Sequence, residues 1–259
     1  MNNRIVVDIG NTRIACGVFV DDKIVDLSHH LLSNTEKAAE DISTDAQAMK
    51  IDEIAICSVV PSVSRALVEE LGKRKQSVYE INESSQKVIS NTYDSLGADR
   101  IANVAGAYQK YLSDAANKQA AIVIDCGTAT TLSAVSSSGK FMGGLITLGL
   151  GNTFRALHQA TEQLPEIEAA TAGKPPLALA SDTSNAITSG CIYAQVGIIE
   201  QWLKIAKKEL GSNTTVIATG GYISIIAPLT DAFDYVDQEL TLYGINFIAQ
   251  AAKDRADRV

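Results

Sequence analysis

The chain has 259 residues, of which 46% are hydrophobic and 20% charged, enough for one large soluble domain or two modest ones. Its formal net charge of −8 argues against non-specific binding to nucleic acid, which requires clustered lysine and arginine. Asp8 follows only a few apolar residues, and no uninterrupted apolar run approaches the length of a membrane span. We therefore expect no signal peptide and no membrane segment.

The four cysteines are far apart and form no C-x-x-C pair, which is typical of small core residues in a reducing compartment. Cys126 follows an aspartate, but no histidine lies near it in sequence to activate it, so a nucleophilic role is not expected. The three histidines have no metal-ligand spacing. We expect a cytoplasmic protein.

The chain begins with a pattern of strands around an acidic turn. Residues 4–10 and 14–20 are expected to be strands on either side of Asp8-Ile9-Gly10-Asn11-Thr12, and a third strand is expected near residues 24–32. The polar residues at 33–36 fit either a capped helix start or a loop.

A buried strand and a helix are expected next. Residues 54–60 are a continuous apolar run, typical of a buried parallel strand, and residues 63–71 fit a helix closed by Gly72. This order of three strands, a helix, a strand and a helix resembles the beginning of one half of the actin-like, or ribonuclease-H-like, ATPase fold.

Asp99 and Arg100 precede a helix that we expect over residues 101–112. Backbone donors at a helix start favour anions, so an acid there fits a simple helix cap when taken alone. An adjacent acid and arginine after Gly97, between two acidic turns, favour a functional site.

The second acidic turn ends an apolar run at residues 121–124, where Asp125 is followed by Gly127 and three threonines. A glycine lets backbone amides approach an anion, hydroxyls can hold phosphate oxygens, and a carboxylate can hold a cation. One such turn is a weak signal, but two copies that each lead into a second strand indicate a duplicated nucleotide-binding unit. The alternative is that Asp125 caps its own turn through Thr128 or Thr130.

The remaining segments repeat the layout of the first half. A glycine-rich strand is expected over 141–149, followed by a helix over 152–163, a loop over 166–176, a long helix over 181–208, a strand from Val216 to the Thr219-Gly220-Gly221 turn, and a last helix over 243–253. The small residues Ala186, Ser189 and Gly190 make the long helix a candidate subunit interface. We expect two domains, 1–117 and 118–259, with the boundary near Lys118-Gln119.

Together these motifs resemble type III pantothenate kinases over nearly the whole chain. The matching stretches are Asp8-Ile9-Gly10-Asn11-Thr12, Tyr93, Gly97-Ala98-Asp99-Arg100, Asp125-Cys126-Gly127-Thr128-Ala129-Thr130-Thr131, Gly143-Gly144, Thr183 with Ser189-Gly190, and Thr219-Gly220-Gly221. The resemblance implies an α/β fold of two duplicated ribonuclease-H-like (actin-like ATPase) domains with the active site in the cleft between them. It also implies ATP-dependent phosphorylation of pantothenate to phosphopantothenate, which begins coenzyme A biosynthesis.

The resemblance further implies roles for individual residues. Asp99 is the implied catalytic base, Asp125 the ligand of a monovalent cation (potassium or ammonium), and Asp8 a magnesium ligand. The implied ATP contacts are Asp8, Ile9, Gly10, Asn11, Thr12, Arg13, Ile14, Ala15 and Thr128. The implied contacts with pantothenate are Tyr93, Gly97, Ala98, Asp99, Arg100 and Thr183, and Thr183 is expected to reach the site of the other subunit of a homodimer.

Two positions depart from the family pattern: Leu148 replaces a proline, and Ser181-Asp182 stands where Gly-x-Asn is common. The family also includes members named as accessory factors for toxin-gene expression, so a catalytically silent regulator is one alternative. A sugar kinase of the same superfamily is another. The presence of Asp8, Asp99 and Asp125 weighs against the first, and the Gly97–Arg100 motif with Tyr93 against the second.

Overall fold

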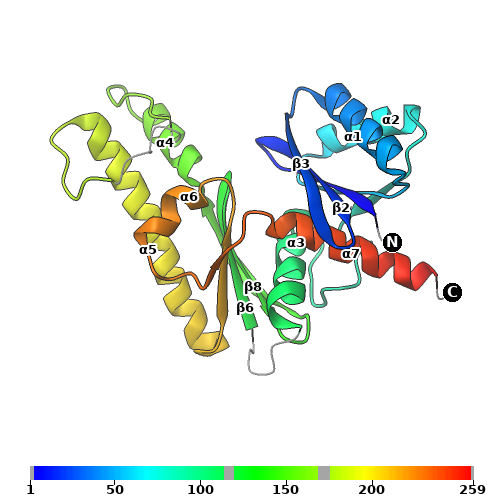
Figure 1. The fold of residues 1–259 in the computed structure, drawn as a ribbon. Coiled ribbons are helices and arrows are strands. Elements are labelled where there is room, and N and C mark those ends of the chain that lie inside the picture. The colour runs from blue at the N-terminus through cyan, green and yellow to red at the C-terminus, as the bar shows by residue number, and fades with distance from the viewer. Residues whose placement is uncertain (1–2, 114–119, 169–175, 258–259) are drawn as a thin grey trace. The chain divides into compact units, whose positions relative to one another are not determined.

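Two five-stranded sheets with corresponding strand orders organise the chain (Figure 1). The computed structural model describes residues 3–113, 120–168 and 176–257. The strands run β3-β2-β1-β4-β5 in the first sheet and, read from the opposite end, β8-β7-β6-β9-β10 in the second. Each strand of the first sheet therefore has a counterpart in the second, which confirms the predicted α/β fold with two repeated halves.

In the first half, β1 pairs antiparallel with β2 and parallel with β4. The elements of this half are β1 (Arg4–Ile9), β2 (Arg13–Val20), β3 (Lys23–Leu31), α1 (Thr35–Met49), β4 (Ile54–Ser58), α2 (Pro61–Lys73), β5 (Val78–Ile81), α3 (Ala98–Ala107) and a π-helical turn (Tyr108–Leu112). The four strands predicted in this region are confirmed, and the polar residues before Thr35 lead into a helix rather than a loop.

In the second half, β6 pairs antiparallel with β7 and parallel with β9. The elements are β6 (Ala120–Cys126), β7 (Ala129–Ser136), β8 (Phe141–Leu148), α4 (Leu150–Gln159), α5 (Thr183–Leu210), β9 (Thr215–Thr219), α6 (Ile223–Ile226), a 3-10 turn (Ala227–Leu229), β10 (Tyr235–Val236) and α7 (Leu240–Ala256). The expected loop over 166–176 lies partly outside the described residues, and the expected boundary at Lys118-Gln119 lies wholly outside them.

Some helix ends differ from the prediction. Gly72 lies inside α2 instead of closing it, and Pro61 begins that helix, where the N–H that proline lacks would have no intrahelical partner. The helix expected over 152–163 is α4, which starts two residues earlier and ends at Gln159. The strand β5 and the two-residue β10 are too short to stand out as periodic patterns.

Each sheet has its own hydrophobic core. Along β1, Ile5, Val7 and Ile9 point to one face and are buried with apolar residues of α1 and α2. In the second half, Ile122 and Ile124 of β6 are buried with residues of α4, α5 and α6. Within the described residues, no helix combines the length and apolar character needed to cross a membrane.

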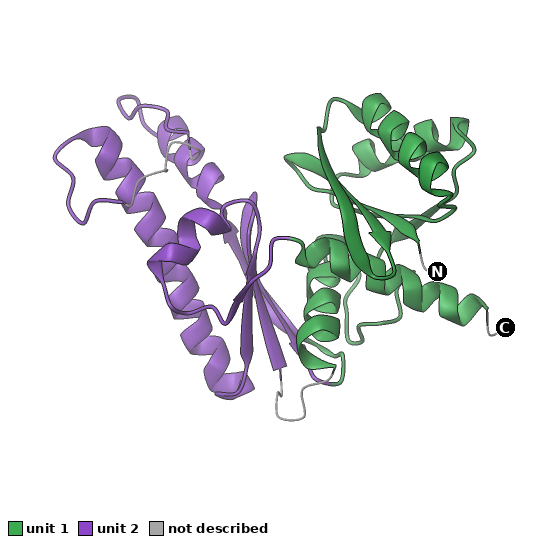
Figure 2. Ribbon diagram, in the orientation of Figure 1, with its two compact units in different colours: residues 1–113, 138–141, 239–259 green, residues 114–137, 142–238 purple. Residues whose placement is uncertain are grey.

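The chain forms two compact units that differ from the expected division into 1–117 and 118–259 (Figure 2). Unit 1 consists of Met1–Ser113, Ser138–Phe141 and Glu239–Val259, and unit 2 of Asp114–Ser137 and Met142–Gln238. The C-terminal helix α7 and the short segment Ser138–Phe141, which ends at the first residue of β8, thus belong to the same unit as the N-terminal sheet.

The packing of α7 on α3 explains why the last helix belongs to unit 1. A Cβ atom at Gly244 would overlap the carbonyl of Ala102, and one at Gly106 would lie 2.6 Å from the carbonyl oxygen of Leu240. The hydroxyl of Thr241 donates a 2.7 Å hydrogen bond to Oδ1 of Asn103. The two helices therefore cross with their backbones almost in contact.

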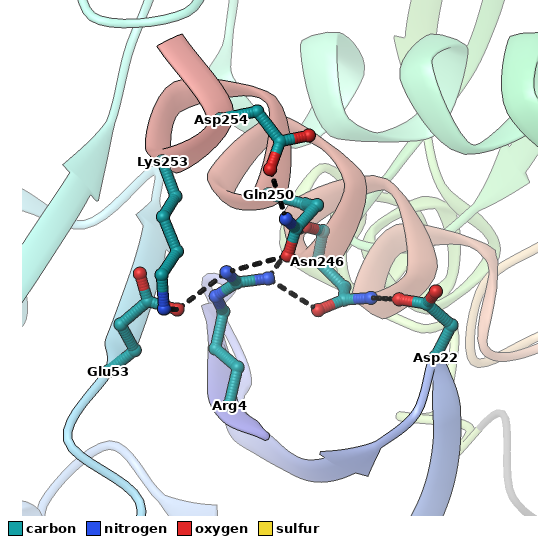
Figure 3. Close-up of polar contacts among 7 residues, drawn as sticks. All are labelled: Arg4, Asp22, Glu53, Asn246, Gln250, Lys253 and Asp254. Atoms are coloured by element: carbon teal, nitrogen blue, oxygen red, sulfur yellow. Dashed lines mark hydrogen bonds and ion pairs between the residues drawn. The ribbon is translucent and has the colours of Figure 1, made fainter. Parts of the chain in front are cut away.

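A buried arginine also joins α7 to the start of β1 (Figure 3). Arg4 is 1% exposed, and its guanidinium donates to the carbonyl oxygen of Asn246 at 3.1 Å and to its Oδ1 at 2.9 Å. It also donates to Gln250 at 3.2 Å and forms an ion pair with Glu53, which in turn lies 3.5 Å from Lys253. The N-terminal strand and the C-terminal helix are thus linked by a satisfied buried charge.

Candidate active site

The first acidic turn lies at the end of β1 in unit 1. The backbone N–H of Gly10 donates to the carbonyl of Arg13 at 3.1 Å, and residues 10–13 connect the paired residues Ile9 and Ile14. Asn11, Thr12 and Arg13 are exposed. The predicted ATP-binding residues from Asp8 to Ala15 are therefore a strand end, a tight turn and the start of β2.

The charges of Asp8 and Asp99 both act on the buried thiol of Cys57. Cys57 is the partner of Asp8 in the parallel pairing of β1 and β4. Burial raises the pKa of Cys57 well above its usual value, and the negative charges of Asp8 and Asp99 raise it further. The structure thus brings the predicted magnesium ligand and the predicted base to the same region of unit 1.

Asp99 lies in the first turn of α3 and contacts the start of its own helix. Its Oδ1 accepts a 2.7 Å hydrogen bond from the backbone N–H of Arg100, and a Cβ atom at Gly97 would come within 2.5 Å of the same oxygen. Burial raises the pKa of Asp99, although the hydrogen bond from Arg100 and its positive charge oppose the shift. A raised pKa brings a carboxylate closer to the range suited to a general base.

Arg100 is buried among aromatic side chains. It is 6% exposed, its Nη1 donates to the hydroxyl of Tyr93 at 3.1 Å, and its guanidinium lies 5.6 Å from the centre of the Phe141 ring. The rings of Tyr93 and Phe141 meet edge to face at 6.0 Å. Two predicted substrate contacts, Tyr93 and Arg100, are thus side by side, together with Phe141, to which the sequence motifs assign no role.

The second acidic turn lies in unit 2 and has one residue fewer than the first. The N–H of Gly127 donates to the carbonyl of Ala129 at 3.1 Å, so that residues 127–129 connect the paired Cys126 and Thr130. Burial and the charge of Asp125 raise the pKa of Cys126 to about 12, which agrees with the expectation that this thiol is not a nucleophile.

Two glycines enclose the carboxylate of Asp125. Gly220 has φ +98°, and a Cβ atom there would overlap Oδ1 of Asp125 and the backbone of Cys126. A Cβ atom at Gly127 would lie 3.3 Å from the same Oδ1. Only glycine fits the backbone at residue 220, so the Thr219-Gly220-Gly221 turn is part of the surroundings of Asp125.

The backbone of Thr128 is held by the start of α4. Its carbonyl accepts hydrogen bonds from the N–H of Gly149 at 3.1 Å and from Nδ2 of Asn152 at 2.7 Å. The hydroxyl of Thr130 donates to Gln195 at 2.8 Å, so its proton does not cap Asp125. Asn152 was not identified from the sequence, because its role depends on a contact between distant residues.

Thr183 is exposed at the first position of α5. The preceding Asp182 caps the helix: its Oδ1 accepts a 2.9 Å hydrogen bond from the N–H of Asn185, and this interaction lowers the pKa of Asp182. The departure from the family pattern at Ser181-Asp182 therefore replaces one good N-cap residue with another. At the other departure, Leu148 is 52% exposed, and its carbonyl accepts from Nε2 of Gln195 at 2.8 Å.

Comparison with known proteins identifies the family. Residues 4–205 match the family model described as type III pantothenate kinase. The type III pantothenate kinase of Dehalococcoides mccartyi (strain CBDB1) is 34% identical over 263 residues, covering 96% of each chain.

Two solved structures share the fold at low identity. MreB5 of Spiroplasma citri, bound to ADP, is 10% identical with a TM-score of 0.56 and covers 100% of this chain and 99% of its own. The inorganic polyphosphate/ATP-glucomannokinase from Arthrobacter sp. strain KM is 16% identical with a TM-score of 0.51, covering 97% and 100%. These likenesses agree with a two-domain ribonuclease-H-like fold, and the match over most of the sequence shows that the chain belongs to the type III pantothenate kinase family.

Proposed function

We propose that this chain phosphorylates pantothenate with ATP through a site in which Asp99 is the general base and Arg100 binds the substrate. Family membership supports the reaction itself. The observation that carries the residue assignment is the cluster in unit 1, where Asp99 is partly buried next to Arg100, Arg100 contacts Tyr93, and the charges of Asp8 and Asp99 both act on the thiol of Cys57.

The roles follow from the chemistry of phosphoryl transfer. The transition state is loose, with charge spread over the transferring oxygens, so positioning and electrostatic stabilisation supply most of the catalysis. Asp99 orients the attacking hydroxyl of pantothenate and receives its proton. Arg100 offers a planar fork of N–H donors to the carboxylate of pantothenate, a geometry that lysine does not provide. Tyr93, Gly97 and Ala98 form the surrounding wall.

The two acidic turns are the proposed nucleotide contacts. The turn from Asp8 to Ala15 would hold the phosphates of ATP, and Thr128 is proposed as a further contact with the nucleotide. Magnesium commonly binds to one or two carboxylates and completes its shell with phosphate oxygens and water. The carboxylate of Asp8, at a strand end beside an exposed turn, fits that requirement, and the bound ion would neutralise the triphosphate.

Asp125 is the proposed ligand of a monovalent cation. Asp125 is paired with Thr219 and Thr131 on the two neighbouring strands, and the glycines at 127 and 220 place no side-chain atom against its Oδ1. An all-oxygen site of this kind suits a large, weakly hydrated ion better than magnesium, which demands tight octahedral geometry. Potassium and ammonium are the candidates.

We expect activity with magnesium-ATP to rise strongly when sodium is replaced by potassium or ammonium at constant ionic strength. Asp125→Ala should abolish this response and weaken ATP binding, because the cation then lacks its charged ligand, while the circular dichroism spectrum stays native. The measurement is the initial rate in each salt for both proteins. Equal rates of the unmodified enzyme in sodium and potassium would return Asp125 to a structural role in its turn.

We also propose a homodimer in which Thr183 reaches the site of the other subunit. Of the small residues expected at the interface, Ala186 and Gly190 are exposed along α5, whereas Ser189 is buried and accepts a hydrogen bond from the N–H of Leu177. Ala194 and Gly197 extend the exposed set, and small residues allow another helix to approach closely. A two-fold dimer is the commonest oligomeric arrangement. Light scattering at micromolar concentration should report twice the mass of the chain, whereas an active monomer would remove both the dimer and the cross-subunit role of Thr183.

An ATP-consumption assay with pantothenate and a small panel of hexoses tests the function directly. Turnover with pantothenate alone is the expected result. Turnover with hexoses but not with pantothenate would identify a sugar kinase, and no turnover with any acceptor would favour a silent relative with a regulatory role. We further propose that the protein works in the cytoplasm with small-molecule substrates and without nucleic acid or membrane partners. Its net charge of −8 disfavours binding to nucleic acid.

A further inference from the structure

We infer that Phe141 is a positioning residue that holds Arg100 and Tyr93 in the orientation required by the carboxylate end of the substrate. The inference rests on the proposed function, because it concerns how the proposed substrate contacts are held. Phe141 is 2% exposed, and its ring contacts both side chains: the Arg100 guanidinium at 5.6 Å and the Tyr93 ring at 6.0 Å.

The position of Phe141 is set by backbone hydrogen bonds on either side of it. Its N–H donates to the carbonyl of Ser90 at 2.9 Å, and its own carbonyl accepts from Nδ2 of Asn91 at 2.9 Å. The N–H of Ser90 donates in turn to the carbonyl of Gly139, also at 2.9 Å. These hydrogen bonds join residues 138–141 to residues 90–91, which lie two residues before Tyr93 in the sequence.

Two residues with positive φ make this fastening possible. Gly139 has φ +71°, and a Cβ atom there would lie 3.3 Å from the carbonyl oxygen of Val88. Asn91 has φ +62°, a conformation that asparagine tolerates better than most residues. The backbone thus takes an unusual conformation in each of the two hydrogen-bonded segments, 138–141 and 90–91. These hydrogen bonds hold the ring of Phe141 against the guanidinium of Arg100.

A fixed aromatic face has a defined effect on an arginine. The ring attracts the guanidinium cation and replaces water on one side of it, and the hydroxyl of Tyr93 binds Nη1 at 3.1 Å. These two contacts limit the rotation of the guanidinium plane before substrate arrives. A pre-oriented fork loses less conformational entropy when it binds a carboxylate, so the contribution should appear in substrate affinity.

The test compares Phe141→Leu with Phe19→Leu, a matched change in the core of the same unit. Phe19 is 0% exposed and its ring contacts Tyr243, so its loss also leaves a cavity but removes no contact with Arg100. Losing a cation–π contact corresponds to about a 2- to 30-fold change in affinity. We expect the KM for pantothenate to rise within that range in Phe141→Leu, while kcat and the KM for ATP change less than about twofold.

A second phosphoryl acceptor distinguishes a loss of Arg100 orientation from a general disruption of the active site. Pantothenol carries a neutral alcohol in place of the carboxylate, so the orientation of the Arg100 fork should matter little for it. We expect the loss in kcat/KM caused by Phe141→Leu to be several-fold smaller with pantothenol than with pantothenate. If Phe141→Leu does not fold, Phe141→Met gives a flexible apolar side chain without a ring and serves the same comparison.

The outcomes distinguish the inference from the proposed function. Equal losses with both acceptors, or a KM for pantothenate that changes no more than in Phe19→Leu, would overturn the positioning role while leaving the kinase assignment intact. An unmodified enzyme that does not phosphorylate pantothenate would overturn the proposed function and this inference with it.

Discussion

Asp99→Asn is expected to lower kcat by roughly 10²–10⁴-fold, the usual effect of losing a general base. The amide cannot accept the proton of the pantothenate hydroxyl, but its oxygen can still accept the hydrogen bond from the N–H of Arg100. The fold and ATP binding should therefore be preserved. Steady-state kinetics with pantothenate and a direct measurement of ATP binding check both parts, and near-normal turnover would show that Asp99 only caps α3.

The raised pKa of Asp99 adds a pH dependence to this result. Because burial raises that pKa above the ordinary value of 3.8, the acid limb of kcat/KM in the unmodified enzyme should lie at a higher pH than an exposed aspartate would give. The folded state also holds this proton more tightly than the unfolded state, so the associated stability is present at low pH and is lost as the pH rises through the folded-state pKa. At neutral pH the ionised carboxylate of Asp99 therefore lowers the free energy of unfolding.

The upward shift of the Asp99 pKa also predicts how stable the Asp99→Asn variant is. At pH 7 the neutral amide should leave the melting temperature unchanged or raise it, and this advantage should shrink as the pH falls and the aspartate of the unmodified protein becomes protonated. A variant that loses activity because it unfolds would instead melt at a lower temperature at every pH.

Arg4→Ala is expected to reduce the free energy of unfolding by about 3 kcal/mol, near the lower end of the range for breaking a buried ion pair. The change leaves the carbonyl and the side chain of Asn246 without the guanidinium that binds them, and it opens a cavity between β1 and α7 (Figure 3). Glu53 keeps Lys253 at 3.5 Å, which limits the penalty. Denaturant unfolding followed by circular dichroism measures the loss.

Lys253→Ala is the matched control for Arg4→Ala. It removes a partner of the same Glu53, but both side chains of that pair are partly exposed, at 41% and 34%. Exposed pairs contribute at most about 1 kcal/mol. Equal losses for the two variants would mean that the buried contacts between Arg4 and α7 contribute nothing beyond the ion pair with Glu53.

Local patterns are enough to predict much of this fold. The apolar run at residues 54–60 and the repeated acidic turns at Asp8 and Asp125 locate strands at the centre of each sheet, because these patterns arise within single strands. The assignment of α7 to unit 1 depends on Gly244 meeting Ala102, a contact between residues far apart in the chain. No periodicity near residue 244 carries that information.

The candidate site divides in the same way. Asp99 and Arg100 stand out because they are adjacent charged residues at a helix start, and the resemblance to a family assigns them roles. Phe141 and Asn152 act through Arg100 and Thr128, which are distant from them in sequence. The sequence around Phe141 does not show which side chains its ring contacts, so its role could not be predicted before the structure was known.

The return of α7 to the N-terminal sheet has a consequence for how the protein is made on the ribosome. Unit 1 receives Ser113 early in synthesis but must wait for Glu239 and the residues after it. At about 5–20 residues per second, that interval lasts roughly 6–25 s. During this time α3 and β1 lack the contacts that α7 makes with them in the finished protein, including the hydrogen bonds from Arg4 to Asn246. Nascent chains halted before residue 239 should therefore be targets for chaperones that bind exposed apolar surface.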